Sequence, residues 1–205
     1  PYLWTRGKLL PERIVSHEIS YLGQFPEYGV TLDARLFHEH IHDTIDFVCP
    51  PGDNCSGNNA TADPRDADNV DPAKQYGYEL QFKWQPGKGT QVIANYAYLH
   101  IDTNYIEDDY SPRYLAGLHV IHAFPGGWDV GLSHYWTASF EPIGERSIKK
   151  STRLDAHLGK RFKLGDTRGK LSIGVQNAGN DYEEFSRDDG NTFETRTYMH
   201  LKLDF

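Results

Sequence analysis

Long hydrophobic runs are missing from this sequence of 205 residues. No stretch approaches the roughly 18 apolar residues that a transmembrane helix needs, which excludes the class of helical membrane proteins. The first residues, Pro1 to Trp4, lack the basic start, apolar stretch and cleavage site of a signal peptide. The formal net charge of −8 argues against nucleic acid as a partner.

No catalytic constellation stands out. Ser133 and His134 with Asp129 supply the residue types of a catalytic triad. Ten histidines and many aspartates make such neighbours common by chance, and triads are recognised by geometry. We therefore predict that the chain is not an enzyme and carries no cofactor.

Aromatic residues are abundant although the chain as a whole is polar. They make up 13% of the sequence, with 13 Tyr and 4 Trp, while the mean hydropathy is −0.65. A barrel wall whose apolar outward residues alternate with polar inward residues explains both values together. On composition alone a soluble β-rich domain explains them as well.

The clearest strand signal is the last eleven residues, 195–205. Their apolar members share one face: Met199, Leu201, Leu203 and Phe205. Their polar members share the other: Arg196, Tyr198, His200, Lys202 and Asp204. This alternation is typical of a strand with one apolar and one polar side. A last strand that ends on Phe resembles the C-terminal signal of bacterial outer-membrane β-barrels.

Alternation of the same kind predicts nine strands along the chain. They span 13–22, 30–36, 76–85, 92–98, 113–124, 128–140, 154–164, 171–175 and 195–205. The connections alternate between short (23–29, 86–89, 125–127, 165–169) and long (47–75, 102–112, 141–151, 183–194). Outer-membrane barrels have short periplasmic turns and longer extracellular loops, so this alternation favours an antiparallel transmembrane β-barrel.

Charges follow the same division between the two faces. The apolar phase carries one full charge, Lys160, whose stem we expect to snorkel towards the short-turn end. The opposite phase carries the others: Glu18, Asp33, Arg35, Glu79, Lys83, Asp129, Arg153, Asp155, Arg161, Lys163, Lys202 and Asp204. A lumen tolerates these charges, whereas lipid does not.

Several short motifs together resemble the late barrel strands of TonB-dependent outer-membrane receptors, in the ferric-siderophore branch. They are Leu10-Pro11-Glu12 with Glu18 and Tyr21, Leu36-Phe37 with Ile41, Asp43 and Ile45, Gly77-Tyr78-Glu79-Leu80 with Trp84, Asn95-Tyr96-Ala97-Tyr98, Ser111-Pro112, the run from Val175 to Tyr182, and Arg196-Thr197-Tyr198 to Phe205. Each motif is weak alone, but together they cover nearly the whole chain in family order.

The resemblance implies that residues 1–205 are the C-terminal part of a 22-stranded barrel in the bacterial outer membrane, with the plug domain and the TonB box absent from this chain. An odd, open set of nine strands would leave backbone groups unsatisfied in lipid, which agrees with a piece of a larger barrel. The implied partners are a ferric siderophore or other iron chelate, the TonB energy-coupling protein through the missing plug, and outer-membrane lipid with lipopolysaccharide.

Candidate ligand residues are aromatic or cationic groups at or near the outer ends of strands. These are Tyr105, Tyr110, Arg113, Tyr135 and Trp136. Each of them also fits a purely structural role in an aromatic girdle or in loop packing.

Two smaller features carry chemistry. Cys49 and Cys55, in the longest loop, predict a disulfide in an oxidising compartment, with two free thiols as the alternative. His38, His40 and His42 share one strand face, a spacing that is a weak candidate for zinc or copper. A strand that has passed beyond the hydrocarbon explains these histidines better, so we predict no metal site.

Two other architectures stay open. Without the first strand, the remaining eight strands from Tyr28 to Phe205 could close as a complete small barrel with a structural or adhesive role. A soluble β-sandwich binding module is the second alternative.

Overall fold

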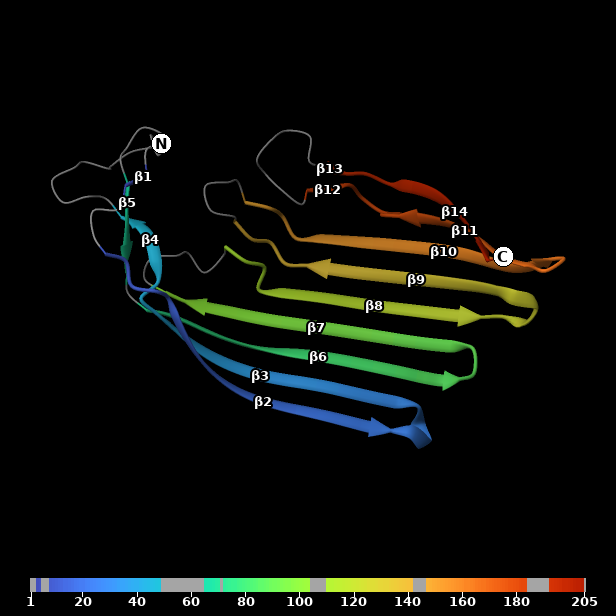
Figure 1. The fold of residues 1–205 in the computed structure, drawn as a ribbon, viewed down its shortest axis with the longest axis horizontal. Coiled ribbons are helices and arrows are strands. Elements are labelled where there is room, and N and C mark those ends of the chain that lie inside the picture. The colour runs from blue at the N-terminus through green and yellow to red at the C-terminus, as the bar shows by residue number, and fades with distance from the viewer. Residues whose placement is uncertain are drawn as a thin grey trace. The chain divides into compact units, whose positions relative to one another are not determined.

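The computed structural model describes residues 3–4, 8–48, 65–70, 72–103, 110–141, 147–183 and 192–204. Nine antiparallel strands form one sheet in the order β14-β11-β10-β9-β8-β7-β6-β3-β2 (Figure 1). Their bounds are β2 Arg13–Phe25, β3 Val30–His42, β6 Ala73–Gly87, β7 Thr90–Asp102, β8 Tyr114–Ala123, β9 Trp128–Thr137, β10 Ser151–Leu164, β11 Thr167–Gln176 and β14 Arg196–Asp204.

These nine strands confirm the nine that the alternation predicts. Short connections join them in pairs, and two of these connections are 3-10 turns, η1 (Pro26–Tyr28) and η2 (Pro125–Gly127). In the described residues the sheet ends in β14 on one side and β2 on the other, so the strands do not close as an eight-stranded barrel. The part of the chain that the structure describes also holds no second large sheet with which to form a sandwich.

The long connections contain short strands that alternation does not predict. The segment 47–75, expected as a loop, includes the end of β4 (Ile45–Val48), all of β5 (Arg65–Asn69) and the start of β6. β5 pairs with β1 (Leu3–Trp4) on one side and with β4 on the other, in a sheet of order β1-β5-β4. β12 (Tyr182–Glu183) pairs with β13 (Thr192–Phe193) around the last long connection. Strands of two to five residues are too short for a period to be recognised in the sequence.

Strand β9 is shorter than expected. It ends at Thr137 instead of Phe140. Phe140 instead forms an isolated bridge with Ile148, with backbone N–H to O distances of 3.1 and 2.7 Å. This bridge lies where a loop from 141 to 151 is predicted.

The chain forms two compact units. Unit 1 comprises Pro1–Glu18, Phe37–Tyr76 and His100–Asp108, and unit 2 comprises Ile19–Leu36, Gly77–Leu99 and Asp109–Phe205. Unit 2 contains the four short turns, and unit 1 contains β1, β4 and β5.

The register of unit 2 separates an apolar face from a polar face. One row across β9, β10, β11 and β14 is Val130, Leu158, Ile173 and Met199. Side chains of the apolar face are strongly exposed, at 50% for Ile173 and 72% for Met199. The next row, on the polar face, is Gly131, His157, Gly174 and Tyr198. Exposed apolar side chains on one whole face are what a sheet that meets lipid requires.

Tyrosines form a belt on the apolar face of β6, β7 and β8. The Tyr78 ring stacks on Tyr98 and Tyr96 with centroids 5.4 and 5.7 Å apart, and Tyr96 stacks on Tyr114 at 6.3 Å. The belt lies towards the ends of these strands that are far from the short turns. Tyrosine rings gather at membrane–water interfaces because one end of the ring is apolar and the other polar.

Lys160 behaves as the sequence predicts. It lies on the apolar face opposite Trp128. Its Nζ donates to the carbonyl oxygen of Gly126 in the η2 turn at 2.8 Å and lies 4.6 Å from the Trp128 ring centroid. The stem thus carries the charge to the short-turn end, where a carbonyl and an indole ring compensate it.

Candidate ligand site on the polar face

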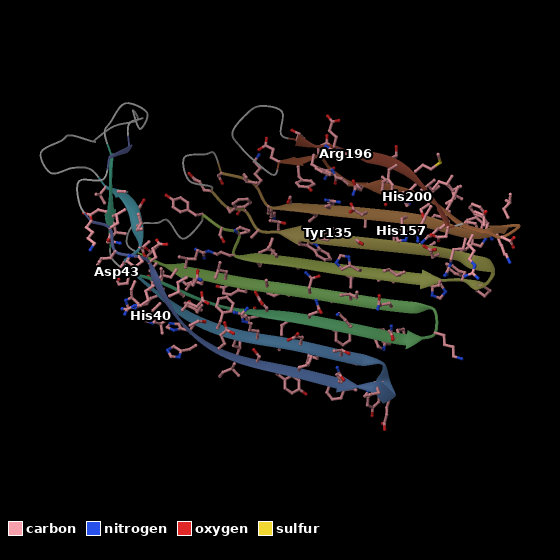
Figure 2. The ribbon with its side chains drawn as sticks, in the orientation of Figure 1. His40, Asp43, Tyr135, His157, Arg196 and His200 are labelled. Atoms are coloured by element: carbon pink, nitrogen blue, oxygen red, sulfur yellow. The ribbon has the colours of Figure 1, made fainter. Side chains whose placement is uncertain are left out.

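An ion cluster occupies the polar face near the short turns. The Asp129 carboxylate lies 3.0 Å from Lys170 Nζ and 3.3 Å from His157 Nε2, and the Asp129 residue is only 6% exposed (Figure 2). Glycine at position 159 leaves room for the cluster, because a Cβ there would lie 2.6 Å from Asp129 Oδ2. The carboxylate therefore has a counter-charge, the Lys170 ammonium, within the wall itself.

A second network lies at the opposite ends of β10 and β11. Arg153 donates to Asp155 through Nε at 2.8 Å and through a terminal nitrogen at 2.6 Å, which is a bidentate pair. The backbone N–H of Asn177 donates to the same carboxylate at 2.9 Å. The Asn177 side chain is fully buried and donates to the carbonyl oxygen of Phe193 at 2.8 Å. Thr195 Oγ1 donates to the Asn177 carbonyl at 2.6 Å and completes the junction.

Aromatic rings flank the Arg153 guanidinium. Its Cζ lies 5.5 Å from the Tyr135 centroid and 5.0 Å from that of Phe193. Arg196 covers the Phe193 ring as well, at 4.5 Å (Figure 2). The ion pair and these rings hold the guanidinium plane in one place. The part of the guanidinium that does not contact Asp155 is therefore fixed in position for a ligand.

A pocket of about 270 Å³ opens beside Arg153. Its described lining is Tyr135, Thr137, Phe140, Ile148, Ser151, Arg153, Tyr182 and Glu183. Ile148 is 2% exposed and forms its apolar floor. An apolar floor with tyrosine hydroxyls, one guanidinium and one carboxylate fits a mixed aromatic and polar ligand.

A larger cavity lies elsewhere and has a different character. It measures about 740 Å³ and is a shallow groove among Val130, Leu158, Ile173 and Met199. These residues belong to the apolar face, so hydrocarbon is the expected occupant. Size alone does not make this groove the ligand site.

The structure separates the sequence-predicted ligand residues. Tyr135 lines the pocket, whereas its neighbour Trp136 lies on the apolar face, where its ring centroid is 4.0 Å from that of His134. Tyr110 and Arg113 lie just before β8 and are not among the described lining residues. Tyr105 lies outside the described residues.

His38, His40 and His42 stack in a row in unit 1. The ring centroids are 4.7 Å apart for His38 and His40 and 6.2 Å apart for His40 and His42. Over the described ranges, no three His, Cys, Asp or Glu side chains are arranged to hold a metal ion. Partial burial and then the neighbouring basic side chains lower the pKa of His40 below its usual value. Cys49 and Cys55 lie outside the described residues, so their pairing stays a prediction.

Sequence patterns miss the residues that organise the pocket. Arg153 and Asp155 are noted only as lumen-phase charges, and Asn177 only as part of a family motif. The spacing of Arg153 and Asp155 could have indicated an ion pair, because residues two apart on a strand share a face and opposite charges there can pair. The left-handed backbone of Asn177, with φ of 53°, is not visible in the sequence.

Replacement of Gly131 by alanine is expected to destabilise the fold by about 1–3 kcal/mol, because an added Cβ overlaps the His157 ring and there is no room for it. The ring would leave Asp129, so the ion cluster would open as well. The matched control is Gly87→Ala, where nothing lies within 4 Å of the new Cβ. Guanidinium unfolding midpoints of the two variants check this expectation, and equal midpoints would contradict it.

Comparison with known sequences places the chain near one family. The sequence model described as "TonB dependent receptor-like, beta-barrel" matches residues 2–178. A search of curated proteins gives no match. None of the described residues forms a helix long and apolar enough to cross a membrane.

Solved structures share the fold at low sequence identity. The pyoverdine receptor FpvA of Pseudomonas aeruginosa PAO1, bound to pyoverdine, gives a TM-score of 0.75 at 17% identity, covering 98% of this chain and 31% of FpvA. The ferric-catecholate import receptor Fiu of E. coli K12 gives 0.69 at 17%, covering 94% and 27%. The copper transporter OprC gives 0.70 at 19%, covering 97% and 32%. The chain thus spans 27–32% of the length of these three proteins.

Proposed function

The chain belongs to the TonB-dependent receptor family through its β-barrel, and from this premise we propose that it forms the C-terminal part of a receptor that imports a ferric siderophore or a similar iron chelate. The family places the chain in the bacterial outer membrane, and its members are receptors and transporters. The match over residues 2–178 is the observation that carries the proposal. The proposal assigns no catalytic step to this chain.

The division of the sheet into two faces supports transport through a lumen. The apolar face of unit 2 meets lipid, and the polar face carries Asp129, Asp155 and Arg153. In the proposed receptor this polar face lines the passage. Energy for import would come from the TonB protein through the plug domain of the receptor.

The pocket beside Arg153 is the proposed contact for the chelate. It lies at the ends of β9 and β10 that join the long connections, which are extracellular in the family. Tyr135 offers an aromatic face and a hydroxyl, and the guanidinium offers positive charge to an anionic chelate. Tyr182 and Glu183 on β12 close the other side.

Substitution of Tyr135 by alanine tests the pocket. In the full receptor, expressed in iron-starved cells that lack their own receptors, we expect uptake of the preferred ferric chelate at low concentration to fall about tenfold, as for one central aromatic contact. The measurement is uptake of radioactive iron presented with a panel of siderophores.

The matched control is Trp136→Ala, because Trp136 is the next residue and lies on the opposite face. Uptake should be retained in that variant. Equal losses in both variants would contradict the pocket, and a wild-type receptor that imports no chelate of the panel would contradict the proposed function.

A further inference from the structure

Basic side chains gather on the polar face of β10, β11 and β14, at the level of the short turn that joins β10 to β11. We call them the basic row: Arg161 and Lys163 on β10, Arg168 and Lys170 on β11, and Lys202 on β14. All five belong to unit 2. His157 and His200, labelled in Figure 2, precede Arg161 and Lys202 on their strands.

The register of the sheet places like charges directly opposite one another. Arg161 lies opposite Lys170, and Lys170 lies opposite Lys202 on its other side. At the next position on the polar face, Lys163 lies opposite Arg168. Like charges that face each other across two strands destabilise a sheet. An anion bound between these cations would relieve the repulsion.

Two carboxylates on the same face compensate part of this charge. Asp129 lies 3.0 Å from Lys170, and Asp204 lies 3.2 Å from Lys202. The second pair contributes little, because both of its side chains are more than half exposed. Asp166 adds a further carboxylate in the turn itself. The cations of the row still outnumber these acidic groups.

Three cations of the row keep their charge uncompensated by a direct contact. Across the ranges that the structure describes, Arg161, Lys163 and Arg168 form no ion pair. All three residues are exposed. Their donors are therefore available to a ligand on the polar face.

The excess of positive charge is confined to these strands. Within unit 2, the polar face of β3 and β6 carries Asp33, Arg35, Glu79 and Lys83, so its charges balance. Arg35 also lies 3.5 Å from Glu79. The basic row is thus a local feature of the wall and not a property of the whole polar face.

The basic row and the pocket beside Arg153 lie on one face of one strand. Arg161 follows Arg153 by eight positions on β10, which is about 26 Å along an extended strand. The even spacing places both residues on the polar face. The pocket adjoins the long connections, and the row adjoins a short turn, which is periplasmic in outer-membrane barrels. A ligand that enters at the pocket would therefore leave past the row.

We propose that the basic row is a second binding site for the imported chelate, at the periplasmic end of the passage, and that this chelate carries net negative charge. The inference rests on the proposed function and names the charge class of its substrate. Guanidinium groups suit carboxylate or catecholate oxygens, because they donate paired hydrogen bonds to oxyanions. An uncharged chelate would gain no such attraction.

A second site near the exit should speed transport without changing capture. Cations that line a passage raise the local concentration of an anion there. The row is exposed and partly compensated, so it should hold the anion weakly, and weak binding lets a ligand leave. Loss of the row should slow the steps after capture, while the affinity of the pocket stays the same.

The first test measures anion binding by the row in the full receptor. The probe is citrate, compared with chloride at equal ionic strength, and the measurement is the thermal unfolding midpoint in detergent. Citrate should raise the midpoint of the wild type, because a ligand that binds the folded state stabilises it. The row variant, Arg161→Gln with Arg168→Gln, should lose about half of this shift or more, since two of the five donors are gone.

The matched control variant is Lys83→Gln with Lys88→Gln. It also loses two cations from the short-turn end of unit 2, but Lys83 lies on β6 and Lys88 in the turn after it. The control variant should keep the whole citrate shift. Without citrate, the midpoint of the row variant should be no lower than that of the wild type, because the substitutions remove repulsion between like charges.

The second test measures uptake of the chelates that the wild-type receptor imports from the siderophore panel. These chelates should carry net negative charge. In the row variant their maximal uptake rate should fall about tenfold, at equal receptor levels. Their Kd for the receptor on de-energised cells should not change, because the pocket beside Arg153 is intact. The control variant should match the wild type in both measurements.

Three outcomes would overturn the inference. The first is an equal citrate shift in the row variant and the control variant. The second is import of uncharged chelates alone, or an unchanged uptake rate in the row variant. The third is a lower midpoint of the row variant without citrate, which would mean that carboxylates elsewhere in the receptor already pair with the row. A wild-type receptor that imports no chelate would instead contradict the proposed function, and with it the transport role of the row, whereas the citrate result would stand.

Discussion

Replacement of Leu132 by arginine is expected to lower the free energy of unfolding of the receptor by about 2–4 kcal/mol, the cost of an arginine on the lipid side of a barrel near mid-membrane. Leu132 lies on β9 midway between Trp128 and Trp136, on the face that both indoles share. Its side chain is 48% exposed, and neither interface is within reach for a snorkelling guanidinium. The measurement is the guanidinium unfolding midpoint of the receptor in detergent or vesicles.

Ser133→Arg is the control for this substitution. Ser133 is the next residue and lies on the polar face, opposite Asp155 on β10 and His119 on β8. A new guanidinium there has an acidic neighbour and water, so we expect a change below about 1 kcal/mol. A greater loss in Ser133→Arg than in Leu132→Arg would mean that the two faces are assigned the wrong way round.

The nine long strands were accessible to prediction because side-chain direction alternates along a strand. In a sheet with lipid on one side and water on the other, apolar and polar residues therefore alternate along each strand. Lys160 shows how far this goes, since the direction of its stem, towards the short turn, follows from its place in the apolar phase, whereas its partner, the carbonyl oxygen of Gly126, is seen only in the structure. The short strands β4 and β5 have no such record, because β4 has only four residues and β5 is almost wholly polar.

The opposite faces of Tyr135 and Trp136 could also have been predicted. Adjacent residues in a strand point to opposite sides, so two neighbours cannot both contact one ligand in the lumen. Choosing ligand residues by closeness to strand ends ignores this alternation. The phase of Val130 and Leu132 already assigns Trp136 to lipid and Tyr135 to the lumen.

The junction at Asn177 could not have been predicted from local pattern. Its contacts join Asp155, 22 positions earlier, and the carbonyl of Phe193, 16 positions later. Its left-handed backbone is one that asparagine tolerates, but the sequence does not show that β11 ends there. Only the pairing of β10 with β11 brings these groups together.

Asp155→Asn is expected to destabilise the receptor by about 1–3 kcal/mol. The asparagine oxygen can still accept from the Asn177 N–H, so the change removes mainly the charge that faces Arg153. Breaking a fully buried ion pair costs about 3–5 kcal/mol. We expect the smaller cost because the side chains of Arg153 and Asp155 are 23% and 18% exposed. Water can therefore partly solvate the guanidinium once it has lost its carboxylate partner.

Lys202 and Asp204 provide a control with the same geometry. They too are two residues apart on one strand, with Nζ 3.2 Å from the carboxylate, but their side chains are 63% and 60% exposed. Asp204→Asn should therefore change stability by no more than about 0.5 kcal/mol. Unfolding midpoints of the two variants in the same detergent isolate the effect of burial from the effect of charge.

Asp155→Asn and Asp204→Asn should differ more in uptake of the ferric chelate than in stability. Without the Asp155 carboxylate, Arg153 loses the bidentate contact that keeps its guanidinium between Tyr135 and Phe193, so the pocket wall is no longer fixed. We expect uptake of the ferric chelate by Asp155→Asn to fall at least as far as in Tyr135→Ala, at equal receptor levels in the outer membrane. Asp204→Asn should transport as the wild type does. Normal uptake by Asp155→Asn would show that the Arg153 network supports the barrel wall without taking part in ligand capture.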